Sequence, residues 1–257
     1  MSTLRPAERH LKELGIRKPS QINLEAIAFH AGALVKYRPL NGCEARILGV
    51  GDKAVITVDN RTIPARQRFS TAHELGHWHH HRGRSSVCRQ DDIGNPRRFP
   101  SDPERVADSY AADLLMPPYL FEPIANKAGK CNFKVVDDLR GEFKTSITAT
   151  AIRLVEYGPE PAILVCHTQK GREWFRRPDH IPERWFPQKE LDADSYAIDV
   201  LYGKDDGSRR RLMDAEAWFD SWFAKKYQLY EETRQITDGK ILTILVFKDE
   251  AMLDEEE

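Results

Sequence analysis

Two histidines four residues apart, His73 and His77, constrain the fold of this chain more than any other feature. On a helix this spacing brings both imidazoles to one face, about one turn apart, where they can ligate a single metal ion. No proline lies between Ala65 and Arg82, so a helix can run through the pair. Glu74 follows the first histidine, where it can act as base on a metal-bound water. The segment therefore has the HExxH arrangement.

A catalytic zinc also needs a third protein ligand and an open coordination position. His81 lies four residues beyond His77, but it is about 12 Å along a straight helix from His73, too far to share an ion. Glu104 fits better, because it lies at the start of a second helical pattern. The sequence Ser101-Asp102-Pro103-Glu104 is also typical of a capping box, in which the glutamate would satisfy backbone donors. The spacing alone leaves both roles open.

A second carboxylate accompanies Glu104 on the same helical pattern, which we expect to run from Pro103 to Met116. Asp108 follows Glu104 by four residues, so the two side chains lie on one face. There it can accept the free N–H of a ligating histidine and fix the tautomer of that ring. The double proline at 117–118 is expected to end this helix.

Two motifs in this order resemble the ImmA/IrrE family of metallo-endopeptidases. Residues 66–77 read RQRFSTAHELGH and residues 104–117 read ERVADSYAADLLMP. The family patterns are approximately RxRFTxAHELGH and ExxANxFAxxLLMP. The chain departs from them at Asp108, where Asn is usual, at Tyr110, where Phe is usual, and at residues 78–80, which read WHH where apolar residues are common. The resemblance extends more weakly from the N-terminal helices to about residue 157.

The resemblance implies a zinc-type metallo-endopeptidase with Glu74 as its catalytic base. It favours His73, His77 and Glu104 as metal ligands, with Asp108 supporting a ligating histidine. The expected cofactor is a divalent metal, Zn²⁺ first and Mn²⁺ or Fe²⁺ as alternatives. The implied partner is a protein substrate, a helix-turn-helix (XRE-type) repressor or antitoxin, whose cleavage would trigger a stress, phage or mobile-element response by changing transcription.

Together, pattern and resemblance predict an α+β protein in three parts. A mainly helical, zincin-like core with a small antiparallel sheet is expected at residues 1–130, and a helical segment resembling a helix-turn-helix at residues 131–158. A separate α+β domain, with a sensory or recruiting role, is expected at residues 159–257. The border before it is marked by Gly158-Pro159-Glu160-Pro161, which has the composition of a linker.

Within these parts the apolar periodicity predicts individual elements. In the core we expect a helix over 4–14, a second after Asn23, and three strands at 34–37, 45–50 and 54–58 that form an antiparallel meander. Two helices are expected at 135–143 and 147–157. In the last part we expect strands at 162–168, 173–176, 195–202 and 240–247 and a tryptophan-rich helix near 215–223.

Charge and hydropathy exclude several classes of protein. Lys and Arg number 39 against 40 Asp and Glu, so the net charge of −1 argues against a polyanion binder and we expect no direct DNA binding. No apolar run approaches the roughly 20 residues of a membrane span. The first 15 residues lack the apolar stretch of a signal peptide. We therefore expect a cytoplasmic protein without a membrane partner.

Two other interpretations stay open. The chain could be a metal-binding regulatory or sensor module that acts by binding protein or DNA without proteolysis, with DNA contacts through the helices at 135–157. It could also be a structural fold in which His73 and His77 are simply buried. A cleavage assay separates the first alternative from the peptidase, and metal analysis separates the second.

Overall fold

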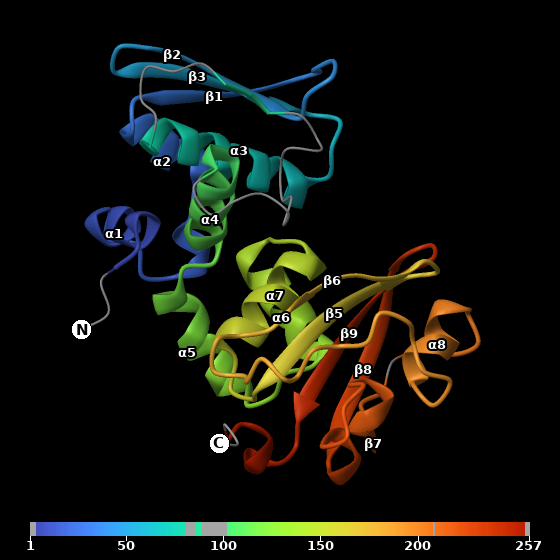
Figure 1. The fold of residues 1–257 in the computed structure, drawn as a ribbon. Coiled ribbons are helices and arrows are strands. Elements are labelled where there is room, and N and C mark those ends of the chain that lie inside the picture. Colours follow the sequence, from blue (N-terminus) through green and yellow to red (C-terminus); the bar gives the residue numbers. More distant parts are fainter. Residues whose placement is uncertain (1–3, 81–85, 89–101, 208, 255–257) are drawn as a thin grey trace. The chain divides into compact units, whose positions relative to one another are not determined.

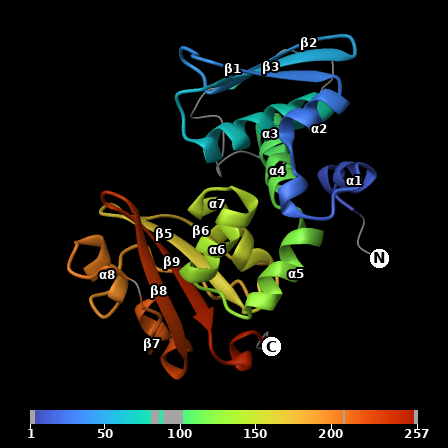
Figure 2. The same cartoon turned by 180° about the vertical axis from the view of Figure 1, so that it is seen from behind.

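The computed structural model divides the chain between two sheets, each covered by its own helices (Figures 1 and 2). It describes residues 4–80, 86–88, 102–207 and 209–254. Helices and sheets are both present, so the predicted α+β class is confirmed.

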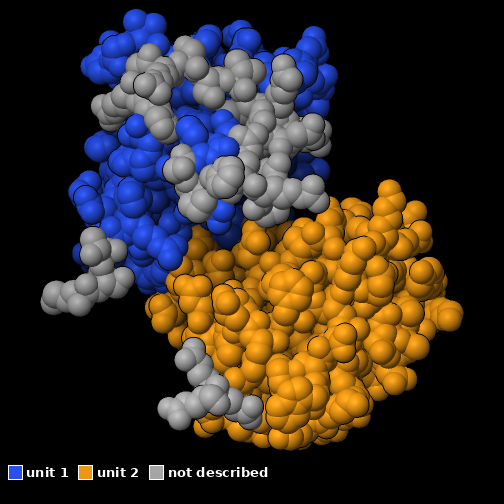
Figure 3. Space-filling view, viewed as in Figure 1, with its two compact units in different colours: residues 1–121, 141–146 blue, residues 122–140, 147–257 orange. Residues whose placement is uncertain are grey.

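By contacts the chain forms two compact units (Figure 3). Unit 1 comprises residues 1–121 and 141–146, and unit 2 comprises residues 122–140 and 147–257. The expected domain borders after residues 130 and 158 stay a prediction.

The sheet of unit 1 has the strand order β1-β3-β2-β4. Its strands are β1 (Ala33–Arg38), β2 (Ala45–Val50), β3 (Lys53–Asp59) and β4 (Ser86–Cys88). β2 is antiparallel to both of its neighbours, but β1 is parallel to β3, so the expected antiparallel meander is wrong.

Connection lengths explain the parallel pair in unit 1. The two-residue turn Gly51-Asp52 forces β2 and β3 to pair as a hairpin, with Val50 opposite Lys53. The six residues 39–44 between β1 and β2 can instead cross two strand spacings, about 10 Å in all. β1 can therefore pair with the edge of β3 that faces away from β2, and on that edge the two strands run parallel.

Four helices of unit 1 match the predicted segments. They are α1 (Pro6–Glu13), α2 (Leu24–His30), α3 (Pro64–His80) and α4 (Pro103–Leu115). Asn23 caps α2 as expected, because its side-chain oxygen accepts a hydrogen bond from the Ala26 amide at 2.9 Å. The double proline ends α4, and Pro118 begins the unexpected helix α5 (Pro118–Ala128), a position that proline tolerates well.

Unit 2 contains an antiparallel sheet in the order β6-β5-β9-β8-β7. The strands are β5 (Ala162–Thr168), β6 (Gly171–Arg176), β7 (Arg211–Asp214), β8 (Gln228–Thr237) and β9 (Lys240–Phe247). β5 is buried on both faces, which explains its unbroken apolar sequence. β8 was not predicted, because its inward side chains include Glu231 and Thr233 and so show no apolar alternation.

Helices cover both faces of this sheet. On one face, α7 (Ile147–Tyr157) contacts β5, and α6 (Phe133–Phe143) is tied to β8 by a hydrogen bond from the Phe133 amide to Glu232. On the other face, α8 (Tyr196–Leu201) packs on β8 and β9. Within the described residues, no helix combines the length and the apolarity that crossing a membrane requires.

Two predicted elements of unit 2 are wrong. The strand expected at 195–202 is α8, because Ser195 caps the amide of Ala197 and Ala197, Val200 and Leu201 form one buried helical face. The helix expected near 215–223 is replaced by two short 3-10 turns, Ala215–Ala217 and Ala224–Lys226. The carbonyl of Trp218 accepts a hydrogen bond from the Gln188 amide instead of continuing a helical ladder.

Candidate metal centre

The site is built on α3, whose residues from Ser70 to Trp78 are all buried. Trp78 fixes the helix against the small sheet: its Nε1 donates to the carbonyl of Ala31 at 2.8 Å, and its ring lies over Gly49 of β2. At the other end, Arg66 and Ser70 both hydrogen-bond the carboxylate of Glu44. These contacts hold the helix face that carries His73 and His77 in the interior of unit 1.

The second helix, α4, begins with a cap at Asp102, two residues before Glu104. Asp102 is the N-cap residue, and its carboxylate accepts the Glu104 amide at 2.9 Å. The carboxylate of Glu104 lies instead beside the two histidines. The alternative reading, in which Glu104 itself satisfies backbone donors from Ser101, involves a residue outside the described parts of the chain.

Three side chains converge between α3 and α4. The Nε2 atoms of His73 and His77 are 3.1 Å apart. Glu104 places Oε2 at 3.2 Å from His73 Nε2 and Oε1 at 3.3 Å from His77 Nε2. His73, His77 and Glu104 form the one group of potential metal ligands found among the described residues. The structure therefore brings together all three residues that the sequence nominates as ligands.

Asp108 sets the orientation of His73. Its Oδ1 lies 2.9 Å from His73 Nδ1. With a carboxylate oxygen of Asp108 as the acceptor, Nδ1 is the ring nitrogen that donates this hydrogen bond. The lone pair of the neutral ring is then on Nε2, which faces His77 and Glu104, as a metal-ligating histidine requires.

Electrostatics favour the ionised form of the third residue. Burial opposes the charge of Glu104, but the ring nitrogens of His73 and His77 beside the carboxylate outweigh this effect and hold the pKa of that carboxyl well below its usual range. Glu104 is therefore an anionic oxygen donor at neutral pH, beside two imidazole nitrogens.

The donor set fits a divalent metal. A tetrahedral ion with nitrogen and oxygen ligands at about 2.0–2.1 Å holds any two ligands about 3.3–3.4 Å apart. The Nε2 atoms of His73 and His77, 3.1 Å apart, come close to this spacing. Glu104 contacts the two histidines through different oxygens, and with one ligand atom from each residue all three atoms lie within 4.8 Å of one another. Two imidazoles and one carboxylate also match the ligand classes that Zn²⁺ accepts.

The remaining candidate residues, Glu74, Tyr110 and His81, are near this trio in the sequence but are not part of it. Glu74 is fully buried on α3 and is not a member of the trio. The ring of Tyr110 stacks on that of His79 with centroids 5.0 Å apart, its hydroxyl lies 3.3 Å from His10 Nδ1, and burial raises its pKa to about 12. His81 lies outside the described residues.

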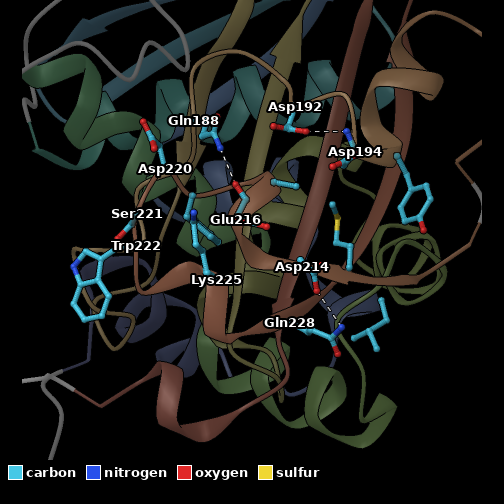
Figure 4. A pocket seen from close by; sticks show the side chains of 15 residues that line it. Gln188, Asp192, Asp194, Asp214, Glu216, Asp220, Ser221, Trp222, Lys225 and Gln228 are labelled. Carbon is cyan, nitrogen blue, oxygen red and sulfur yellow. Dashed lines mark hydrogen bonds between the residues drawn. The ribbon is translucent and has the colours of Figure 1, made fainter.

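Unit 2 carries a separate hollow of about 990 Å³ that the sequence did not point to (Figure 4). Carboxylates surround it, and the side chain of Trp222 stands at its edge (Figure 4). Its lining residues include Asp192, Asp194, Asp214, Glu216 and Asp220. The hollow has no histidine or cysteine in its lining, so its chemistry differs from that of the trio.

Two comparisons relate this chain to known proteins. Residues 28–155 match the family model described as Peptidase_M78, IrrE N-terminal-like domain, a range that includes all three residues of the trio. A solved structure of a Mycobacterium tuberculosis transcriptional regulator is similar in fold, with a TM-score of 0.61 and 15% identity over 96% of this chain and 77% of that chain. No curated protein matches the chain.

Proposed function

Residues 28–155 of this chain form an IrrE N-terminal-like domain of the Peptidase_M78 family, and on that premise we propose that the protein is a metal-dependent endopeptidase. The observation that carries the proposal is the convergence of His73, His77 and Glu104, which offer one ligand atom each within 4.8 Å of one another. We assign the metal as Zn²⁺ from the donor set.

The residues have distinct roles in this proposal. A bound divalent metal supplies Lewis-acid activation of water and of the peptide carbonyl. Glu74 accepts the proton of the attacking water on a carboxylate oxygen and passes it to the amine that leaves. Asp108 keeps His73 in the tautomer with a free Nε2 lone pair.

The proposed substrate is a helix-turn-helix repressor or antitoxin, cut in the cytoplasm to change transcription under stress. The motifs shared with the ImmA/IrrE family support this assignment. The similar fold of a protein described as a transcriptional regulator is compatible with it.

The decisive variant is Glu74→Gln, which removes the base and leaves the three ligands in place. The purified, zinc-loaded protein is incubated with the helix-turn-helix repressor encoded beside its gene, and the products are identified by intact mass. We expect the parent to cut the repressor and the variant to lose at least 100-fold in rate, because general base catalysis contributes about 10²–10⁴-fold. Zinc content, measured by elemental analysis, is expected to stay at the parent level.

Glu13→Gln is the matched control, because Glu13 is an exposed glutamate of α1. It should cut at the parent rate. A Glu74→Gln protein that still cuts would remove Glu74 from the mechanism. A zinc-loaded parent that binds the repressor without cutting it would favour the regulatory module. A parent that binds no metal would favour the structural fold in which His73 and His77 are simply buried.

A further inference from the structure

α3 and α4 approach each other closely at Gly76, one residue before the second proposed ligand histidine. We propose that Gly76 is a positioning residue for the metal centre: its missing side chain sets the distance between the two helices at which Glu104 can meet the histidine pair. This inference rests on the proposed metal site and explains how that site is held together.

The geometry at Gly76 leaves no room for a side chain. A Cβ atom there would lie 2.9 Å from the Cα of Ala107, 3.0 Å from the Ala107 carbonyl oxygen and 3.2 Å from the Cβ of Tyr110. Two of these atoms belong to the backbone of α4, so no change of rotamer can relieve the contact. Because ordinary carbon contacts begin near 3.4 Å, even one methyl group requires α4 to move away from α3.

Such a movement would act directly on the third ligand. Ala107 lies three residues after Glu104 and one before Asp108, all within α4. Three residues of helix span about 4.5 Å, less than one turn, so both carboxylates move with the Ala107 backbone. The Glu104 contacts of 3.2 and 3.3 Å and the Asp108 contact of 2.9 Å would all lengthen together.

The histidine pair itself should be unaffected, because both rings are on α3 and their spacing is set within one helical turn. Gly76→Ala would even favour α3 locally, since alanine is the better helix former. A weakened metal site in this variant would therefore report the distance between the helices and not damage to α3. This contrast makes the proposal testable.

The test is titration of Co²⁺ into the metal-free protein, followed by visible absorption, with folding checked by circular dichroism. For Gly76→Ala we expect the Co²⁺ dissociation constant to rise tenfold or more and the absorption bands to shift as they do in Glu104→Gln. The matched control is Gly141→Ala in α6, where a Cβ meets no atom within 4 Å. That control should keep the parent affinity and spectrum.

The outcomes separate the inference from the proposed function. A folded Gly76→Ala protein with the parent affinity and spectrum overturns the positioning role. A parent that binds no Co²⁺, or a Glu104→Gln protein that binds it as the parent does, overturns the metal site itself. If Gly76→Ala does not fold, Ala107→Ser replaces it as the test, because it adds an atom on the α4 side of the same helix contact. Its Co²⁺ affinity and absorption spectrum are then compared with those of the parent.

Discussion

At the scale of single residues, we expect the proposed metal centre to depend on one hydrogen bond outside the ligand trio His73, His77 and Glu104. Asp108 accepts from His73 Nδ1 at 2.9 Å and thereby decides which ring nitrogen faces Glu104. The family pattern usually has Asn at this position, and an amide oxygen can accept the same bond. The acceptor oxygen, and not the negative charge, is therefore the feature we expect to matter.

A pair of substitutions separates these two features. Asp108→Ala removes the acceptor, so His73 can turn or change tautomer, and we expect zinc affinity to fall by about 10–100-fold. Asp108→Asn keeps an acceptor oxygen and should stay within a fewfold of the parent. Competition with a zinc-binding dye measures both constants. Equal losses in the two variants would show that the charge of Asp108 is what the site requires.

At the scale of elements, α6, α7 and the connection between them occupy the segment that was expected to resemble a helix-turn-helix. Lys144 begins this connection with φ of 56°, a left-handed conformation that glycine adopts without strain. α7 then buries Thr150, Ala151, Leu154 and Val155. Because α7 also contacts β5, this face is a packing surface of unit 2.

Lys144 gives a prediction about stability. Lys144→Gly should raise the free energy of unfolding by about 0.5–1 kcal/mol, since the left-handed conformation costs a non-glycine residue about 1–2 kcal/mol and the added freedom of glycine in the unfolded chain offsets part of that gain. Urea unfolding followed by circular dichroism measures the change. Lys144→Ala keeps the strained backbone and should show no gain. A glycine variant less stable than the parent would contradict the argument.

At the scale of the whole molecule, stability toward acid depends on a histidine far in sequence from the metal site. His167 of β5 is fully buried in unit 2, with its ring 5.6 Å from that of Trp218. Burial, helped by repulsion from Arg172, lowers the pKa of His167 to about 4. The unfolded chain has the ordinary value of about 6.5, so between pH 6.5 and pH 4 it binds more protons than the folded chain.

Acid should therefore unfold the parent more readily than a variant without this histidine. The contribution of His167 is fully present above pH 6.5 and is lost as the pH falls toward 4. Between pH 7.5 and 4.5 we expect the parent to lose about 2–3 kcal/mol more stability than His167→Leu. Urea unfolding at both pH values measures the difference, and His180→Leu, at an exposed histidine, is the control. Parallel losses in parent and His167→Leu would refute this assignment.

Several features of the fold could be predicted because their causes are local. The helix of His73 and His77, the Asn23 cap and the end of α4 at the double proline each depend on residues within one or two turns. The strand predicted at 195–202 failed because a six-residue apolar segment satisfies both helical and strand periodicity. β8 was missed because its buried Glu231 is satisfied by Ser195 and Trp218, which are distant in sequence.

The amino-acid sequence by itself determined the candidate ligand residues and the shared helical face of the two histidines, because helix periodicity is a property of neighbouring residues. Only the tertiary structure placed the Glu104 carboxylate beside the two imidazoles, on a helix whose N-cap is Asp102. It also decided that β1 runs parallel to β3. Contacts of this kind join residues tens of positions apart, and local periodicity carries no information about them.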